Sequence, residues 1–274
     1  MTRIPRQRFT VRRALHWTAG GVVAAQIATM AGLVAFNGIK RRGRRPYRFP
    51  TAPVEPLEVS GHQVEIFTFG RDLYAAMTSD VESAQHTVYL ETFIWKNDNV
   101  GRRFRQSLVE AAARGVKVYA MWDTFANLVV GPRFFRQLEG VQVRAQPLVT
   151  PSWMPTLRNL GRDHRKLLIV DSKVAALYAD RWRDTHARIT GPAVGELENA
   201  FVDMWNQRPK GALAPRRNQP VLPSPDVRYW DTPFAVHRNS PRMAVYPIRN
   251  MYLEAIDRAS ERIWMTQGLS LIHI

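Results

Sequence analysis

The segment GRDHRKLLIVD, residues 161–171, joins a pair of reactive side chains to a strongly apolar run. Four consecutive apolar residues at 167–170, bounded by polar ones, are typical of a buried strand, and we predict a strand over residues 164–171. Alternate residues of a strand face the same way, so His164 and Lys166 should project side by side. An imidazole beside an ammonium suits phosphate chemistry, because the imidazole can attack phosphorus and the ammonium can hold the phosphoryl oxygens. The alternative is a chance pairing at a strand edge in a basic protein.

Helical and strand patterns alternate on both sides of this segment. Helices are expected at residues 72–86, 101–114, 132–138 and 192–205, and strands at residues 87–95, 116–122, 141–145, 173–178 and 182–189. Alternation at this spacing predicts an α/β fold, with a mixed sheet flanked by helices.

Proline content and periodicity suggest how the chain is divided. Residues 46–60 are proline-rich and predict a linker before a first domain at residues 61–206. Residues 207–247 carry eight prolines and predict a long connection. Beyond it, a helix at 251–262 and a strand at 263–267 repeat the pattern of residues 81–90. This repeat predicts that residues 248–274 begin a second copy of the domain, which stops before a reactive pair of its own.

The basic charge of the chain is concentrated near its N-terminus. Residues 1–48 hold eleven of the 39 Lys and Arg and no acid, so the remaining 28 basic and 23 acidic residues give only +5 of the +16 total. Residues 17–39 are 23 residues without a charge, and at about 1.5 Å per residue they can span a bilayer core of roughly 30 Å.

The basic clusters on both sides of residues 17–39 suit anionic headgroups. We therefore expect residues 1–45 to form a basic N-terminus with one transmembrane helix, which anchors the protein in the cell membrane. A cleaved signal peptide or a buried helix is the alternative. Positive charge on both flanks leaves the orientation of the anchor open.

The sequence resembles the phospholipase D superfamily, and most closely its bacterial cardiolipin synthase-type enzymes. The residues that carry the resemblance are HRKLLIVD at 164–171, LETFIW at 90–95, VGRRF at 100–104, AARGVKV at 112–118, WRDTH at 182–186, Arg188 and GPAV at 191–194. The resemblance implies a phospholipase D-like sheet and a site where two H-x-K motifs meet. In that chemistry one histidine forms a phosphohistidine and the other protonates the leaving alcohol, without a metal or other cofactor.

Carried onto this sequence, the resemblance makes His164 the nucleophile or its acid partner, and Lys166 the phosphate clamp. Asp184 would hold the tautomer of the histidine, and Asp171 would end the strand in a structural or orienting role. The alternatives are a surface ion pair for Asp184 and an ordinary turn residue for Asp171. Glu91 lies in a predicted buried strand and needs a partner there. It is either a substrate-binding acid or half of a structural ion pair.

The expected function is a membrane-anchored phosphatidyltransferase that joins two phosphatidylglycerol molecules and releases glycerol. Its expected partners are this phospholipid and an anionic membrane. One alternative is a phospholipase D-type hydrolase, since the acceptor depends on how well the site excludes water. Another is an inactive fragment, because the second motif is missing and the family's Gly pair and Asn do not follow Asp171. Nucleic acid is not expected, because residues beyond 48 lack a strong basic footprint. The oligomeric state stays open.

Overall fold

The computed structural model describes residues 55–146, 162–177, 185–207, 220–225 and 245–264, together with isolated residues between 28 and 39 and at 237 and 239. The chain divides into two units, Met1–Pro50 and Thr51–Ile274. Most of the expected anchor at 17–39 lies outside the described residues, and those of its residues that are described are helical. Across the described part of the chain, no helix is both long and apolar enough to cross a membrane.

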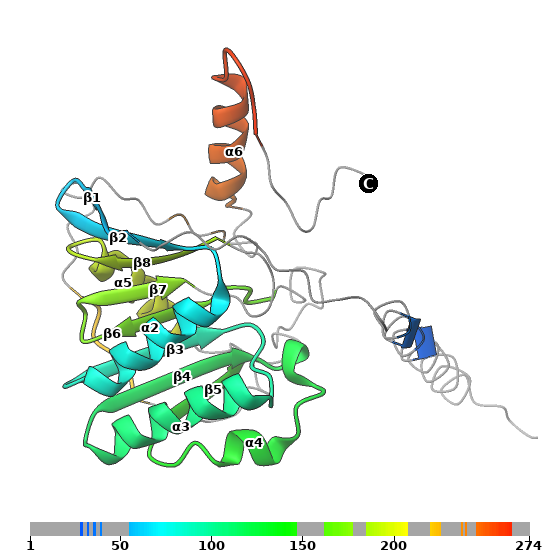
Figure 1. Ribbon diagram of the computed structural model, residues 1–274, viewed down its shortest axis with the longest axis vertical. Coiled ribbons are helices and arrows are strands. Elements are labelled where there is room, and N and C mark those ends of the chain that lie inside the picture. Colours follow the sequence, from blue (N-terminus) through cyan, green and yellow to red (C-terminus); the bar gives the residue numbers. More distant parts are fainter. Residues whose placement is uncertain are drawn as a thin grey trace, which may run out of the picture. The chain divides into compact units, whose positions relative to one another are not determined.

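An eight-stranded sheet forms the centre of the second unit (Figure 1). Its strand order is β1-β2-β8-β7-β6-β3-β4-β5. The strands are β1 (Leu57–Val59), β2 (His62–Phe67), β3 (Thr87–Thr92), β4 (Lys117–Asp123), β5 (Gln142–Gln146), β6 (Leu167–Val170), β7 (Val174–Leu177) and β8 (His186–Thr190). Strands β3, β4 and β5 are parallel, and the other neighbouring pairs are antiparallel. The predicted mixed sheet is confirmed.

Helices cover both faces of this sheet (Figure 1). Helices α2 (Gly70–Ser83) and α3 (Asn99–Ala113) pack on one face, and α5 (Val194–Asn206) packs on the other. A short 3-10 helix, η1 (Phe125–Asn127), and helix α4 (Pro132–Arg136) follow β4. Helix α6 (Pro247–Asp257) has no buried residue.

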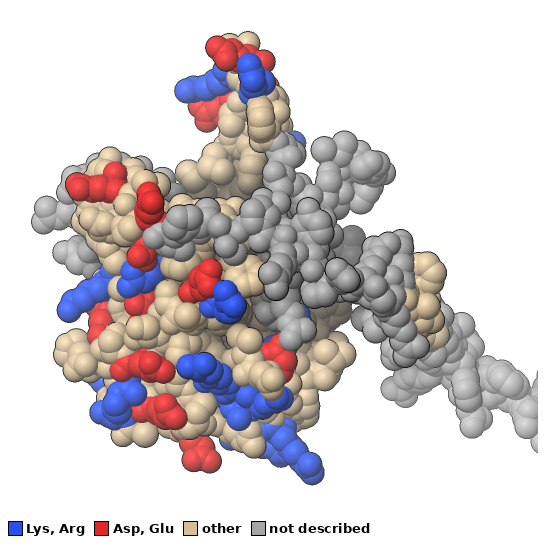
Figure 2. Space-filling view, in the orientation of Figure 1, with Lys and Arg blue, Asp and Glu red and all other residues tan. Residues whose placement is uncertain are grey.

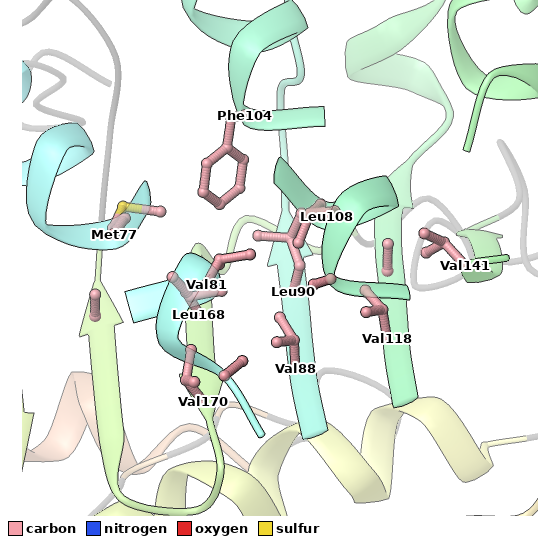
Figure 3. Close-up of a cluster of buried hydrophobic side chains, with 14 of the residues drawn as sticks. Met77, Val81, Val88, Leu90, Phe104, Leu108, Val118, Val141, Leu168 and Val170 are labelled. Atoms are coloured by element: carbon pink, nitrogen blue, oxygen red, sulfur yellow. The ribbon is translucent and has the colours of Figure 1, made fainter. Parts of the chain in front are cut away.

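Alternate residues of the central strands enter two separate cores. The first core lies under α2 and α3 and includes Leu90 of β3 and Leu168 of β6, which pack with Leu108 of α3 (Figure 3). The second core lies under α5 and includes Ile169 of β6 and Phe201 of α5. Because both faces are covered, the central strands have near-continuous apolar sequences rather than alternating ones.

The structure corrects several boundaries that the sequence predicted. The predicted linker at 46–60 includes strand β1, because Ser60 and Gly61, at φ 49° and 78°, close a two-residue hairpin turn onto β2. Strand β6 begins at Leu167 rather than at residue 164. In the strand expected at 263–267, residues 263 and 264 are not in a strand, and the other three residues lie outside the described part of the chain.

A cluster of charges ties helix α2 to the antiparallel half of the sheet. The Arg188 guanidinium on β8 donates to both carboxylate oxygens of Asp80 on α2, at 2.9 and 2.8 Å, and to Glu65 on β2 at 2.6 Å. The hydrogen bonds to Asp80 are the main reason that the pKa of Arg188 is raised above its ordinary value. Asp80 is only 8% exposed, so its charge depends on this partner.

Replacing Arg188 with alanine should therefore leave a buried carboxylate without its cation. We expect Arg188→Ala to lower the free energy of unfolding by about 3 kcal/mol. Arg71→Ala is the matched control, because Arg71 pairs with Asp72 while 81% of its side chain is exposed, and it should cost less than about 0.5 kcal/mol. Urea denaturation of the two variants measures both values, and equal losses would contradict the assignment.

Candidate active site

The H-x-K pair lies at the edge of the sheet where the parallel strands end. Strand β6 runs antiparallel to β3 and pairs Leu167 with Glu91, so the residues before β6 lie beside the residues that follow β3. Strands β3 and β4 are parallel and in register up to Thr92 and Trp122, so their carboxyl ends share this edge. Ligands of open α/β sheets bind at the carboxyl ends of strands, which makes this edge the candidate site.

His164 and Lys166 lie in contact although both precede the strand. The Lys166 Nζ is 3.1 Å from His164 Nδ1 and donates to the His164 carbonyl at 2.8 Å. The ring of Phe93 supports the pair, with its centroid 4.5 Å from that of the His164 imidazole and 5.6 Å from Lys166 Nζ. An ammonium can only donate, so in this arrangement Nδ1 accepts. The proximity that the i, i+2 spacing predicted is present in the structure.

Arg165 points to the other side of the segment and fixes it in place. Its guanidinium contacts Glu91 Oε1 at 2.6 Å and Asp163 Oδ1 at 3.3 Å, and it donates to the carbonyl of Ala200 on α5 at 3.0 Å. Glu91 is fully buried, and burial raises the pKa of its carboxyl well above the ordinary value, while the Arg165 guanidinium opposes this rise. The sequence left two roles open for Glu91, a substrate-binding acid or half of a structural ion pair. In the structure Glu91 is paired with Arg165.

Two polar residues that sequence reasoning missed join the loops of this edge. Asp123 ends β4, and its carboxylate accepts from the backbone N–H of Phe125 at 2.8 Å and of Asp163 at 3.3 Å. Asn127 donates to the carbonyl oxygens of Phe93 and Asp123, both at 2.8 Å, and accepts from the Trp95 N–H at 2.7 Å. The sequence could have indicated these two residues, because an Asp and an Asn in the loop after a predicted strand often bond to nearby backbone groups.

Asp171 lies at the opposite end of β6 from His164. Its carboxylate accepts from the backbone N–H groups of Gln85, His86 and Thr87, each at 2.8 Å. At about 3.3 Å per residue, the strand separates Asp171 from His164 by on the order of 20 Å. The sequence left a structural role, an orienting role and an ordinary turn residue open for Asp171. Its placement supports the structural role, because the carboxylate joins the end of β6 to the start of β3.

Asp184, which was expected to orient the histidine, lies outside the described residues. Within the described residues, no group of three or more His, Asp or Glu side chains is placed to hold a metal ion. The site geometry therefore rests on His164, Lys166, Phe93 and the polar contacts beneath them.

Comparison with known proteins shows what this chain is similar to. No protein-family model matches the chain. It is 29% identical over 161 residues to the major cardiolipin synthase ClsA of Bacillus subtilis (strain 168), a match that covers 53% of this chain and 33% of the relative. It is 24% identical over 273 residues to cardiolipin synthase A of Pseudomonas fluorescens (strain SBW25), covering 94% of this chain and 53% of the relative. The curated proteins that this chain resembles are thus bacterial cardiolipin synthases.

The chain spans about half, or less, of the length of these curated relatives. Among solved structures, the phospholipase D family member Nuc from Salmonella typhimurium is 20% identical, with a TM-score of 0.38, and the match covers 56% of this chain and 96% of that one.

The contacts of Asp171 predict a pH-dependent contribution to the stability of this protein. Burial raises the pKa of Asp171, but the hydrogen bonds from Thr87, Gln85 and His86 outweigh it and hold the pKa below the ordinary 3.8. The contribution is therefore complete above the unfolded value and is lost as the pH falls through the folded pKa. We expect Asp171→Asn to cost about 2 kcal/mol at neutral pH and to approach wild type in acid.

Chemical denaturation at neutral pH and at several acidic values measures this difference. The matched control is Asp257→Asn, which changes an exposed carboxyl on α6 and should have an effect below about 0.5 kcal/mol. A loss in Asp171→Asn that stays constant down to the lowest pH would show that the charge of the carboxylate is not what stabilises the turn.

Proposed function

We propose that this chain supplies His164 and Lys166 to a phosphatidyltransferase of the cardiolipin synthase type, which acts on phosphatidylglycerol through a phosphohistidine. The observation that carries the proposal is the Lys166 ammonium 3.1 Å from the His164 ring at the carboxyl edge of the parallel strands. A cation beside a nucleophilic ring provides two of the components that this transfer needs, the nucleophile and the clamp on the phosphate oxygens.

In the first step the imidazole of His164 attacks the phosphorus of one phosphatidylglycerol, whose phosphate oxygens are held by Lys166. The bond from phosphorus to the headgroup glycerol breaks, and the leaving oxygen takes a proton from an acid partner. In the second step a hydroxyl of another phosphatidylglycerol attacks the same phosphorus, the P–N bond breaks, and the proton returns to the acid partner. The products are one cardiolipin and one glycerol.

The remaining predicted residues have supporting roles in this proposal. Glu91 and Arg165 hold the backbone from which His164 projects, since both are engaged beneath it. Asp171 positions the far end of β6, and Asp184 would orient the imidazole. The apolar residues 17–39, between their basic flanks, would hold the enzyme at the cell membrane, where its substrate lies.

The acid partner of His164 has to come from elsewhere. The printed sequence contains one H-x-K, at residues 164–166, and the chemistry requires a second histidine. The curated relatives are longer than this chain, and we propose that the second histidine belongs to a region outside the printed sequence. On its own, the chain then lacks the acid for the first step, so the covalent intermediate forms only when that second histidine is supplied.

Trapping of the intermediate tests the proposal. We expect the chain, incubated with phosphatidylglycerol labelled at phosphorus and with a second H-x-K segment of a relative, to retain an acid-labile label. His164→Asn should abolish this labelling, because the P–N bond has no imidazole nitrogen on which to form. His86→Asn is the matched control, because His86 is an exposed histidine beside the opposite end of β6 and should label like wild type.

The products of the reaction separate the remaining functions. Cardiolipin and glycerol formed when a second H-x-K segment of a relative is added would support the transferase, whereas phosphatidic acid alone would identify a hydrolase. Equal labelling of His164→Asn and wild type would overturn the assignment of the nucleophile. No label in wild type under any of these conditions would show that the chain is inactive.

A further inference from the structure

Four large apolar side chains are exposed beside the candidate site. Phe125, Leu128 and Val129, in and just after η1, are 53%, 60% and 90% exposed, and Ile94, in the loop after β3, is 46% exposed. We call these four residues the apolar tip. Single exposed apolar residues are ordinary, but a cluster on two neighbouring loops marks an interaction surface.

The apolar tip is held by a rigid set of hydrogen bonds. Asn127 bonds to the backbone on both sides of Ile94, at the Phe93 carbonyl and the Trp95 N–H, so the two loops are joined. The Asp123 carboxylate accepts from the Phe125 N–H at 2.8 Å and fixes the start of η1. These hydrogen bonds fix the backbone of both loops, on which the four apolar side chains are exposed.

Basic side chains surround the apolar tip. Apart from Arg165, which is paired with Glu91, the residues of the surrounding loops and helix ends, 93–103, 123–136 and 162–166, contain seven basic side chains: Lys96, Arg102, Arg103, Arg133, Arg136, Arg162 and Lys166. Arg162 lies directly on the tip, with its Cζ 4.8 Å from the centroid of the Phe125 ring. Figure 2 shows basic side chains gathered toward the N-terminal end of α3.

The acids in these residues do not balance the basic charge at the surface. Asp123 and Asp163 are only 1% and 8% exposed. Asp98 caps α3 by accepting from the Gly101 N–H at 2.9 Å. An apolar surface with a basic surround matches an anionic bilayer, in which an apolar interior lies beneath negative headgroups. A second copy of this chain fits less well, because its own basic surround would be repelled.

We propose that the apolar tip inserts into an anionic lipid bilayer, with the surrounding Lys and Arg on the headgroups. This docking surface is separate from the expected anchor at 17–39 and from the reactive pair. It extends the proposed function by presenting His164 and Lys166 to phosphates at the membrane surface, but it rests on exposure and charge and does not require catalysis.

A fluorescent probe at the tip tests the proposal in the full chain. The sequence has no cysteine, so Val129→Cys provides a single labelling site for a polarity-sensitive dye, at a side chain that is 90% exposed. We expect a blue shift, and quenching by lipids with spin-labelled acyl chains, in vesicles of equal parts phosphatidylglycerol and phosphatidylcholine. Phosphatidylcholine alone should give a weaker response, and added salt should reduce the response by screening.

The matched control is Glu139→Cys, an exposed position in the turn beside the C-terminal end of α3, at the opposite edge of the sheet. A dye at position 139 should show the emission of a water-exposed dye with every vesicle composition, even if an N-terminal anchor holds the chain on the vesicles. Adding Leu128→Asp to the Val129 probe should lower the partitioning of the tip about tenfold, which is the loss expected for one buried leucine.

Three results would overturn the docking. They are a Val129 probe that stays in water on anionic vesicles, equal quenching at positions 129 and 139, and a blue shift that depends on protein concentration without lipid, which would identify self-association. If the proposed function is wrong but the docking is right, the result differs from all three. The probe would then insert as expected, but no labelled intermediate would form.

Discussion

Burial of the four apolar residues of β6 between two helical layers sets the geometry of the whole site. Strand β6 pairs antiparallel with β3, with Leu168 opposite Leu90. Leu168 and Val170 enter the core under α2 and α3, and Leu167 and Ile169 enter the core under α5. A slip by one residue would exchange both sets between two differently shaped cores, so the register is strongly specified. The same register determines where the residues immediately before the strand emerge.

Polar contacts fix both ends of strand β6. At one end the Asp171 carboxylate accepts from three consecutive backbone N–H groups. At the other end Arg165 contacts Glu91 and Asp163. Removing one partner of a buried pair costs more than the pair contributes, so such pairs favour one arrangement over its competitors. His164 is exposed beside this fixed backbone, as a positioned nucleophile requires.

The sequence was sufficient for features that depend on local pattern. The alternating elements follow from periodicity, and the structure shows them. His164 and Lys166 are close as predicted, but they precede the strand, and the contact comes from Lys166 reaching back to the His164 ring and carbonyl. Features that depend on tertiary contacts were missed. Asp123 and Asn127 read as ordinary residues after a strand, because their partners at Phe93 and Asp163 are about 30 to 40 residues away in sequence. Strand β1 was read as part of a linker, because it is a short exposed edge next to prolines.

The reactive pair and the apolar tip share one edge of the sheet for a reason of topology. Parallel strands place the loops after β3 and β4 together, and antiparallel β6 brings its preceding residues to the same edge. Hydrogen bonds couple the two features, since the Asp123 carboxylate accepts from the N–H of Phe125 in the tip and from the N–H of Asp163, the neighbour of His164. A phosphodiester in a bilayer lies at a fixed depth, just above the acyl chains. A rigid link between an inserting surface and a nucleophile therefore sets the height of that nucleophile above the membrane. Exposed apolar side chains would be a liability on a freely diffusing protein, whereas at this position they would determine which phosphates His164 can reach.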